Sequence, residues 1–307
     1  MKITLIGAGG VGAETAELVL RENLAKELIL VDLNADPLKG KFLDLAHAAA
    51  ICGSTTKFQY TVDYLGAENS DVYIVTAGLP RTPEMKSRND LFVANTKVIS
   101  AICNKIKTLA ADPLIIMITN PLDLILRYAI EFCQLNPKKT LGMSGVLDSA
   151  RFRFYLAKAA QVPVSEVTGL VIGPHGEAMV PLVSLAKISG KPLSASLTPD
   201  QIAQVITETV QAGANITNLQ GRSAIHAPAA ALVKMLQIIQ ANSEEIISAS
   251  VQLSGEYGIK DVCLEVPLQI NQDGIAAIIE LKIVEEELAA LRESAKILQE
   301  AYQQGIN

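Results

Sequence analysis

His175 stands in the stretch "VIGPHGEAMVP" (171–181), where it follows an apolar run and lies between Pro174 and Gly176. The chain has only three histidines. A histidine that only fills space needs no glycine beside it, whereas one that faces a ligand can use the room that glycine leaves. The alternative is a satisfied loop histidine, and this residue alone does not exclude it.

Asp148 and Arg151 lie in "GVLDSARFRF" (145–154), close to the predicted start of a helix. Their spacing of three residues places both side chains on one helix face. Such a pair can serve a site, but it is also what a helix N-cap aspartate with a surface ion pair would look like.

The stretch "GAGGVG" (7–12) has glycines at Gly7, Gly9 and Gly12, between a predicted strand and a predicted helix. Glycines at this spacing allow a tight turn, a close approach of the backbone to a pyrophosphate, and close packing of the helix on the sheet. Methyltransferases and other nucleotide-binding proteins use similar turns, and a plain strand-to-helix turn is the bland alternative.

Asp32 strengthens the dinucleotide hypothesis, since it lies 32 − 12 = 20 residues beyond the last glycine, at the end of the second predicted strand. A carboxylate at this distance can accept both ribose hydroxyls and repels a 2′-phosphate. The sequence therefore favours NAD over NADP as cofactor. An unrelated aspartate at a strand end is the alternative.

Two further strand ends carry polar residues. The stretch "TAGLPRTPEMKSRNDL" (76–91) holds Arg81, Lys86 and Arg88, and "TNPLD" places Asn120 at the next strand end. Open parallel sheets bind ligands at the carboxyl ends of their strands, so these residues are binding candidates. A solvated loop and ordinary Asn-Pro turn chemistry are the alternatives.

The first half alternates apolar strands with helix-length segments, which predicts a parallel sheet of the Rossmann type, doubly wound by helices on both faces. The predicted strands cover residues 3–7, 27–33, 71–78 and 113–121, and the predicted helices cover 11–25 and 90–110.

The alternation of apolar strands and helices ends after about residue 145. Helices are predicted at 149–161, 199–214, 222–241 and 283–304, with strands between them. We therefore expect an α/β protein: a Rossmann NAD-binding domain over residues 1–144, followed by a mixed α+β substrate-binding and catalytic domain over 145–307. No linker separates the halves, so we expect them to pack intimately.

Composition excludes several classes of function. The net charge of −6 argues against nucleic acid and anionic membranes as partners, and no apolar run is long enough to span a bilayer. The four cysteines form no C-x-x-C pair, so we expect buried free thiols in a reducing cytoplasm. The three histidines lack neighbours at metal-ligand spacing, and we expect no metal site.

Together the motifs resemble those of the L-malate/L-lactate dehydrogenases, and within that family the prokaryotic malate dehydrogenases of lactate-dehydrogenase type. The resemblance runs along essentially the whole chain. The motifs that carry it are "GAGGVG", "LVDLN", "TAGLPR", "TNPLD", "GVLDSARFR" and "GPHGEAMVP", in this order.

The resemblance implies NAD-dependent, reversible oxidation of (S)-malate to oxaloacetate, with a small 2-keto/2-hydroxy dicarboxylic acid as partner. His175 would donate and accept the substrate proton, and Asp148 would hold its other ring nitrogen and raise its pKa. Arg151 would clamp the substrate carboxylate through two parallel hydrogen bonds.

The remaining roles follow from the same resemblance. Arg88 would polarise the substrate carbonyl when its loop closes, Asn120 would hydrogen-bond the reacting oxygen, and Arg81 would bind the second carboxylate. The family also implies a homodimer or homotetramer, and a place in the tricarboxylic acid cycle. The expected NAD-binding residues are Gly7, Gly9, Gly10, Val11, Gly12, Asp32, Thr76, Ala77, Gly78, Asn95, Thr119 and Asn120.

The chain departs from the family pattern at three points. Glu177 stands where Asp is usual, Pro83-Glu84 replaces the usual Pro-Gly, and the two loop arginines are 88 − 81 = 7 residues apart, one more than usual in malate-type loops. The last two points bear on substrate choice and keep lactate, or another L-2-hydroxy acid, open. A non-catalytic dinucleotide-binding protein is the alternative outside the enzymes, but it would have no need of the full set of candidate residues.

Overall fold

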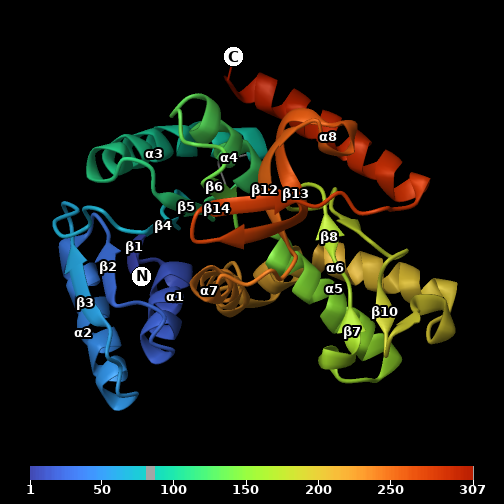
Figure 1. Ribbon diagram of the computed structural model, residues 1–307, viewed down its shortest axis with the longest axis horizontal. Coiled ribbons are helices and arrows are strands. Elements are labelled where there is room, and N and C mark those ends of the chain that lie inside the picture. The colour runs from blue at the N-terminus through green and yellow to red at the C-terminus, as the bar shows by residue number, and fades with distance from the viewer. Residues whose placement is uncertain (81–86, 307) are drawn as a thin grey trace.

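The computed structural model describes residues 1–80 and 87–306, and it builds them around one nine-stranded sheet. The strand order is β14-β13-β12-β6-β5-β4-β1-β2-β3, and Figure 1 shows this sheet running through the middle of the molecule. Two smaller sheets, of three and two strands, lie in the second half of the chain.

Six strands from the first half form the parallel part of the large sheet, and each neighbouring pair among them is parallel. The order reverses between β1 and β4, which is where sheets of this kind bind ligands. This confirms the predicted doubly wound sheet. The six strands are β1 (Lys2–Ile6), β2 (Glu27–Val31), β3 (Lys57–Thr61), β4 (Val72–Val75), β5 (Leu114–Met117) and β6 (Thr140–Gly142).

Successive residues of the central strands enter two different hydrophobic cores. In β2, Leu28 and Leu30 lie in one core, whereas Ile29 and Val31 lie in the other. Because helices cover both faces, nearly every position of a central strand must be apolar. The expectation drawn from the apolar runs is therefore confirmed.

The helices divide between the two faces of the sheet (Figure 1). One face is covered by α1 (Gly10–Arg21), α2 (Ala35–Ile51) and α7 (His226–Ala241), and the other by α3 (Arg88–Leu109), α4 (Leu122–Glu131) and the last turns of α8 (Glu285–Ile306). In the part of the chain that the structure describes, no helix is both long and apolar enough to cross a membrane.

The antiparallel strands β12 (Ile247–Ser254), β13 (Lys260–Asn271) and β14 (Gly274–Ile278) extend the same sheet. Strand β12 joins β6 where Ser250 lies opposite Gly142. The sheet thus runs without a break from the first half of the chain into the second. The predicted division into two domains stays a prediction.

The rest of the second half packs around a third core, between α5 (Gly145–Ala160) and α6 (Pro199–Gln220). This mixture of helices and short antiparallel strands agrees with the predicted α+β character. The short strands are β7 (Val167–Thr168), β8 (Val171–Ile172), β9 (Val180–Pro181), β10 (Lys187–Ile188) and β11 (Lys191–Pro192).

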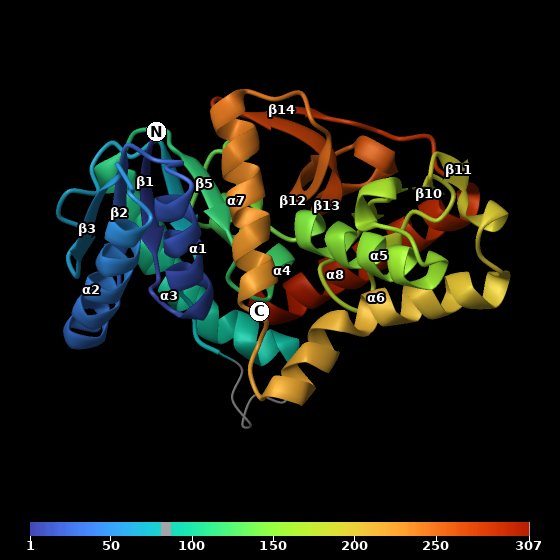
Figure 2. The same ribbon diagram turned by 90° about the horizontal axis from the view of Figure 1, so that it is seen from below.

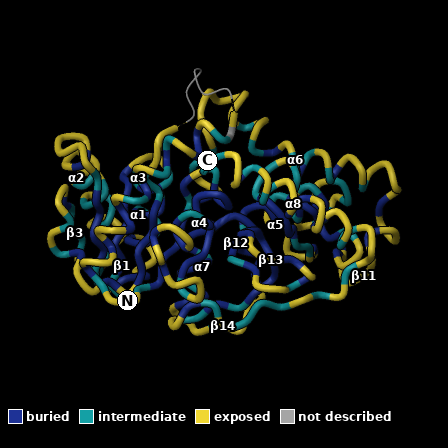
Figure 3. Tube along the Cα trace, turned by 90° about the horizontal axis from the view of Figure 1, so that it is seen from above, coloured by how far each residue is buried: buried dark blue, intermediate teal, exposed yellow. Residues whose placement is uncertain are grey.

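Helix α7 joins the two halves, since it packs against α1 on one side and α5 on the other (Figure 2). The contact is tight at its start, because a Cβ added to Gly10 would lie 2.7 Å from Cδ1 of Ile225. Figure 3 shows that α7 is largely buried, whereas α2 is mostly exposed. One prediction is wrong here: Cys52, at the end of α2, is an exposed thiol, and only the other three cysteines are buried.

Candidate active site

The turn between β1 and α1 has no room for side chains at two of its glycines. Gly7 has a φ of +107°, and a Cβ there would lie 2.6 Å from the backbone nitrogen of Ala77. A Cβ on Gly12 would lie 1.9 Å from the carbonyl oxygen of Gly7. At Gly9 no described atom lies within 4 Å of an added Cβ, so the turn stays open there. This shape fits the close approach of a pyrophosphate.

The first turn of α1 presents uncapped amides at this opening. Its N-cap, Gly9, makes no side-chain hydrogen bond to the helix, and free N–H groups at a helix N-terminus bind anions. At the end of β2, Asp32 accepts the N–H of Ala8 at 2.8 Å and that of Asn34 at 3.2 Å. The Asp32 carboxylate therefore lies beside the turn, as the ribose of a dinucleotide requires.

Hydrogen bonds tie the ends of β4 and β5 to the glycine turn. The Thr76 hydroxyl donates to the carbonyl of Gly7 at 2.8 Å, and the Thr119 hydroxyl donates to the carbonyl of Ala77 at 2.6 Å. A Cβ on Gly78 would lie 2.4 Å from Cγ2 of Thr119, so these loops touch. The predicted cofactor residues from three strand ends thus lie together.

Asn95 is fully buried, and its amide links two of these loops. Its oxygen accepts the N–H of Leu79 at 2.7 Å, and its nitrogen donates to the carbonyl of Asn120 at 2.8 Å. Asn120 itself is exposed at the end of β5. Two predicted substrate ligands fall outside the described part of the chain: Arg81 altogether, and Arg88 in its side chain.

The second cluster forms where α5 begins and β8 ends. Asp148, in the first turn of α5, is fully buried, and its Oδ2 lies 2.6 Å from Nδ1 of His175. Its Oδ1 accepts a hydrogen bond from Nη1 of Arg151 at 2.7 Å, one helical turn further on. The structure therefore brings together three residues that the sequence predicted as functional.

The backbone of His175 is fixed as well. Its N–H donates to Oδ2 of Asp123 at 2.8 Å, while Oδ1 of Asp123 accepts the hydroxyl of Ser250 at 2.6 Å. Two residues before the histidine, Gly173 exchanges both backbone hydrogen bonds with Glu265 of β13. Helix α4 and strands β12 and β13 thus hold the imidazole in place.

The charges of this cluster act on one another. Burial alone would lower the pKa of the His175 imidazole, but the Asp148 carboxylate beside it raises that pKa well above its ordinary value. Burial likewise opposes ionisation of Asp148, yet the imidazolium and the Arg151 guanidinium lower the pKa of its carboxyl. The arrangement therefore suits a histidine that holds and releases a proton.

Arg151 has donors that Asp148 does not use. Its side chain is 13% exposed, and its Nε has no hydrogen-bond partner among the described residues. A Cβ on Gly213 of α6 would lie 3.6 Å from Nη2, so the helix leaves space beside the guanidinium. A cation next to the imidazole, with donors to spare, can bind a carboxylate.

Ligand atoms of Asp148, His175 and Glu265 lie within 4.8 Å of one another, a spacing that could also suit a metal ion. Both Asp148 oxygens, however, already bind the imidazole and the guanidinium. Arg151 supplies positive charge to this carboxylate. The expectation of no metal site stays a prediction.

Sequence reasoning did not single out Asp123 and Glu265. Glu265 carried a signal, since it is a lone acid inside the apolar stretch "VCLEVPLQI" (262–270) of a strand. A charged residue in such a run is rarely buried without a function or a partner. Asp123 carried none, because an acid near a helix start is common.

Comparison with known proteins places these two clusters in a family. Residues 1–142 match the family model of the lactate/malate dehydrogenase NAD binding domain, and residues 145–307 match that of the lactate/malate dehydrogenase alpha/beta C-terminal domain. The chain belongs to the lactate/malate dehydrogenase family. The resemblance seen in the sequence motifs is thereby confirmed.

Individual relatives cover almost the full length of the chain. The malate dehydrogenase of Caldivirga maquilingensis is 40% identical over 285 residues, which are 93% of this chain and 92% of the relative. That of Salinibacter ruber is 38% identical over 96% of this chain and 94% of its own. A lactate dehydrogenase from Cryptosporidium parvum, solved with lactic acid and nicotinamide adenine dinucleotide, has a TM-score of 0.95 and 34% identity over 100% of this chain and 98% of its own.

Residues 1–142 match a family model described as an NAD binding domain, and the geometry of the glycine turn fits that cofactor. The open backbone at Gly9, the uncapped start of α1 and the carboxylate of Asp32 are what a pyrophosphate and an unphosphorylated ribose need. The predicted cofactor is confirmed.

Proposed function

We propose that the chain is an NAD-dependent malate dehydrogenase, which reversibly oxidises (S)-malate to oxaloacetate. The observation that carries the proposal is the buried Asp148 carboxylate, which binds the His175 imidazole with one oxygen and the Arg151 guanidinium with the other. A protein that only bound the dinucleotide would have no use for a buried imidazole of raised pKa beside an arginine with unused donors.

In the oxidation direction, Nε2 of His175 accepts the proton of the C2 hydroxyl as the carbonyl forms. The glycine turn and Asp32 would hold NAD, which would supply the acceptor for the hydride that leaves C2 with both electrons of the C–H bond. Asp148 stabilises the imidazolium that results. The hydrogen bond from the backbone N–H of His175 to Asp123 keeps the residue, and with it the ring, in position. Reduction of oxaloacetate is the reverse, with the imidazolium as acid.

Substrate binding is divided among residues from both halves. Arg151 binds the carboxylate next to the reacting carbon, Asn120 hydrogen-bonds the reacting oxygen, and Arg88 polarises it. Arg81 binds the second carboxylate, which malate has and lactate lacks. In this scheme residues 1–144 hold the cofactor and residues 145–307 supply the relay, with the cofactor contacts made by the residues predicted for them.

Steady-state kinetics of NADH oxidation with oxaloacetate, pyruvate and a branched 2-keto acid test the substrate. We expect kcat/KM to favour oxaloacetate by roughly 30-fold or more, because pyruvate would leave a water-excluded guanidinium without its partner. Arg81→Gln should cut activity on oxaloacetate at least about tenfold and leave pyruvate unchanged or improved. A wild type that prefers pyruvate would make the chain a lactate dehydrogenase instead.

The same assay with NADPH tests the cofactor assignment. We expect NADH to be preferred because the Asp32 charge would face a 2′-phosphate. Equal kcat/KM for the two cofactors would contradict this role of Asp32.

The remaining aspects of the proposal concern the setting. We place the enzyme in the cytoplasm, as a homodimer or homotetramer, at the malate step of the tricarboxylic acid cycle. Light scattering coupled to size-exclusion chromatography measures the oligomeric state, and a monomeric mass would contradict that part.

A further inference from the structure

Glu265 is a carboxyl group at the centre of the molecule that the proposed mechanism does not use. It lies in the middle of β13, and its side chain is 0% exposed. Neither of its carboxyl oxygens accepts a hydrogen bond from any described group. Buried acids are almost always hydrogen-bonded, so a carboxyl group at this depth without a hydrogen bond calls for a physical account.

The backbone explains why this side chain stands where it does. Glu265 pairs with Gly173 through two backbone hydrogen bonds of 2.8 and 2.9 Å, which brings β13 against the segment that leads to His175. As a result Oε1 of Glu265 lies 3.7 Å from Nδ1 of His175, the ring nitrogen that Asp148 binds at 2.6 Å. The two carboxyl groups are therefore neighbours behind the imidazole.

A charged Glu265 would be costly in this place. An ionised carboxylate without hydrogen bonds in a dry interior pays a large desolvation penalty, and a second negative charge beside Asp148 adds repulsion. In agreement, the pKa of Glu265 lies well above its ordinary value, chiefly because of burial and then because of the negative charge of Asp148. The pKa of Asp148 in the same pocket is lowered instead. Of two acids that share a pocket, one keeps its proton.

The charged groups that act on Glu265 come from three neighbouring segments. They are His175 in the loop after β8, Asp148 at the start of α5, and Asp123 at the start of α4. Arg151 reaches the cluster through Asp148, whereas Ser250, opposite Glu265 on β12, is neutral. Only Asp148 offers a carboxylate that already carries two charged partners.

We propose that Glu265 is a positioning residue of the relay: a neutral carboxylic acid that shares its proton with the Asp148 carboxylate and so limits how tightly the Asp148–His175 pair holds the catalytic proton. The inference rests on the proposed function for its kinetic meaning. A hydrogen bond from Glu265 draws negative charge away from the oxygen that faces the imidazole, which lets His175 release its proton more readily. Malate oxidation, which starts from the neutral ring, gains from this.

Two substitutions of Glu265 distinguish whether its carboxyl group is neutral or ionised in the wild type. Glu265→Gln keeps the shape and a donor for Asp148, whereas Glu265→Leu keeps the volume and removes the donor. The titration of the histidine ring is followed by NMR against pH, which is practicable because the chain has three histidines and His175→Asn assigns the signal. Gln269→Leu, a polar-to-leucine change further along the same strand, is the matched control.

We expect the midpoint of the His175 titration to stay in place in Glu265→Gln and in the control, and to move to higher pH in Glu265→Leu. Malate oxidation at a pH below that midpoint should fall about tenfold in the leucine variant, because a hydrogen bond to a charged group is worth about that factor or more. Oxaloacetate reduction should extend to higher pH, with KM for oxaloacetate little changed.

Other outcomes overturn the proposal. A midpoint that moves to lower pH in Glu265→Gln means that Glu265 is ionised, and a midpoint unmoved in both variants means that its role is only structural. If Glu265→Leu does not fold, Glu265→Met replaces it, because methionine adapts to irregular spaces. The NMR titration needs no substrate, so it remains decisive even if the assays refute malate as substrate.

Discussion

Replacing His175 by Asn removes the imidazole but keeps the backbone hydrogen bond to Asp123. We expect kcat to fall about 10²–10⁴-fold, because a general acid–base group contributes that much. NADH binding, measured by its fluorescence, should be unchanged, since the glycine turn and Asp32 supply that site. His226→Asn, at a side chain 82% exposed, is the control and should keep full activity. A variant of His175 with more than about a tenth of the wild-type rate would contradict its role.

The raised pKa of His175 predicts opposite pH profiles for the two directions. Folding favours the imidazolium here, so the ring keeps its proton above the ordinary histidine range and loses it only as pH rises through the raised pKa. Oxaloacetate reduction needs the imidazolium, and its kcat/KM should fall over that alkaline range while malate oxidation rises. Asp148→Asn removes the charge responsible and should move both profiles to lower pH. Reduction that already declines below about pH 6.5 would refute this assignment.

At the scale of residues, the sequence predicts those side chains that stand in a recognisable motif. His175, Asp148 and Arg151 could be predicted, because each stands in a motif with a recognisable spacing. Asp123 and Glu265 could not, because their importance comes from contacts across 52 and 90 residues of chain, 175 − 123 and 265 − 175. Such contacts exist only once α4 and β13 have packed around the histidine loop.

At the scale of elements, a substitution in the glycine turn tests its role in NADH binding. Gly12→Ala would place a methyl group 1.9 Å from the carbonyl oxygen of Gly7, so α1 must shift away from β1. We expect NADH to bind at least about tenfold more weakly, because overpacking costs about 1–3 kcal/mol and moves the phosphate-binding amides. Isothermal titration calorimetry measures this.

The matched control is Gly40→Ala in α2, where no described atom lies within 4 Å of the added Cβ. That variant should bind NADH as the wild type does and be slightly more stable, since alanine favours helix. Equal NADH affinities for the two variants would contradict the role of the turn.

The elements found from sequence are those with a strong apolar pattern. All four strands predicted in the first half exist: β1 has the predicted five residues but begins one residue earlier, and the other three are shorter than predicted, because the polar ends of their runs form loops. Helix α2 and strand β3 were not predicted. In α2 only Leu38 is buried, and β3 is an edge strand whose one buried residue, Thr61, is still 9% exposed, so neither shows the contrast between faces that reveals an element.

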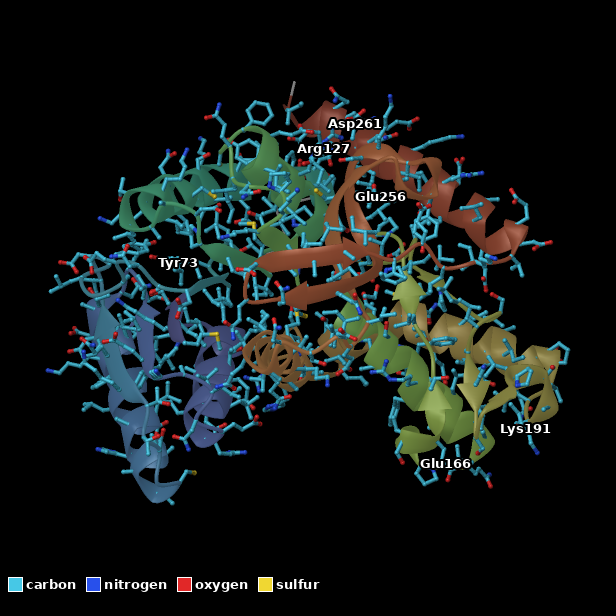
Figure 4. All side chains as sticks on the ribbon, in the orientation of Figure 1. Tyr73, Arg127, Glu166, Lys191, Glu256 and Asp261 are labelled. Carbon is cyan, nitrogen blue, oxygen red and sulfur yellow. The ribbon has the colours of Figure 1, made fainter. Side chains whose placement is uncertain are left out.

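At the scale of the whole molecule, the C-terminal helix closes over the first half of the chain. Arg127 of α4, labelled in Figure 4, lies close to α8. It stacks on the ring of Tyr302 of α8 at 4.0 Å and binds Glu131 at 2.8 Å, with only 8% of its side chain exposed. Arg127→Met keeps the apolar stem and removes the charge. We expect it to lower the free energy of unfolding in urea by about 1–3 kcal/mol.

Lys296→Met is the control for this prediction, since Lys296 lies on α8 in an exposed ion pair with Glu293. Its effect should stay within about 0.5 kcal/mol, because exposed pairs contribute little. If both variants unfold at the same urea concentration, the contact between Arg127 and Tyr302 does not fasten α8.

The junction between β6 and β12, where Gly142 lies opposite Ser250, constrains how halves of two related enzymes can be joined into one chain. A Cβ added to Gly142 would lie 3.0 Å from that of Ser250, so only small side chains fit across the junction. The hydroxyl of Ser250 also binds Asp123, which in turn holds the amide of His175. A chimaera that crosses over near residue 145 takes Gly142 and Asp123 from one parent and Ser250 from the other. Its His175 will keep its place only where the two lineages have the same fit at this junction, however well each half folds.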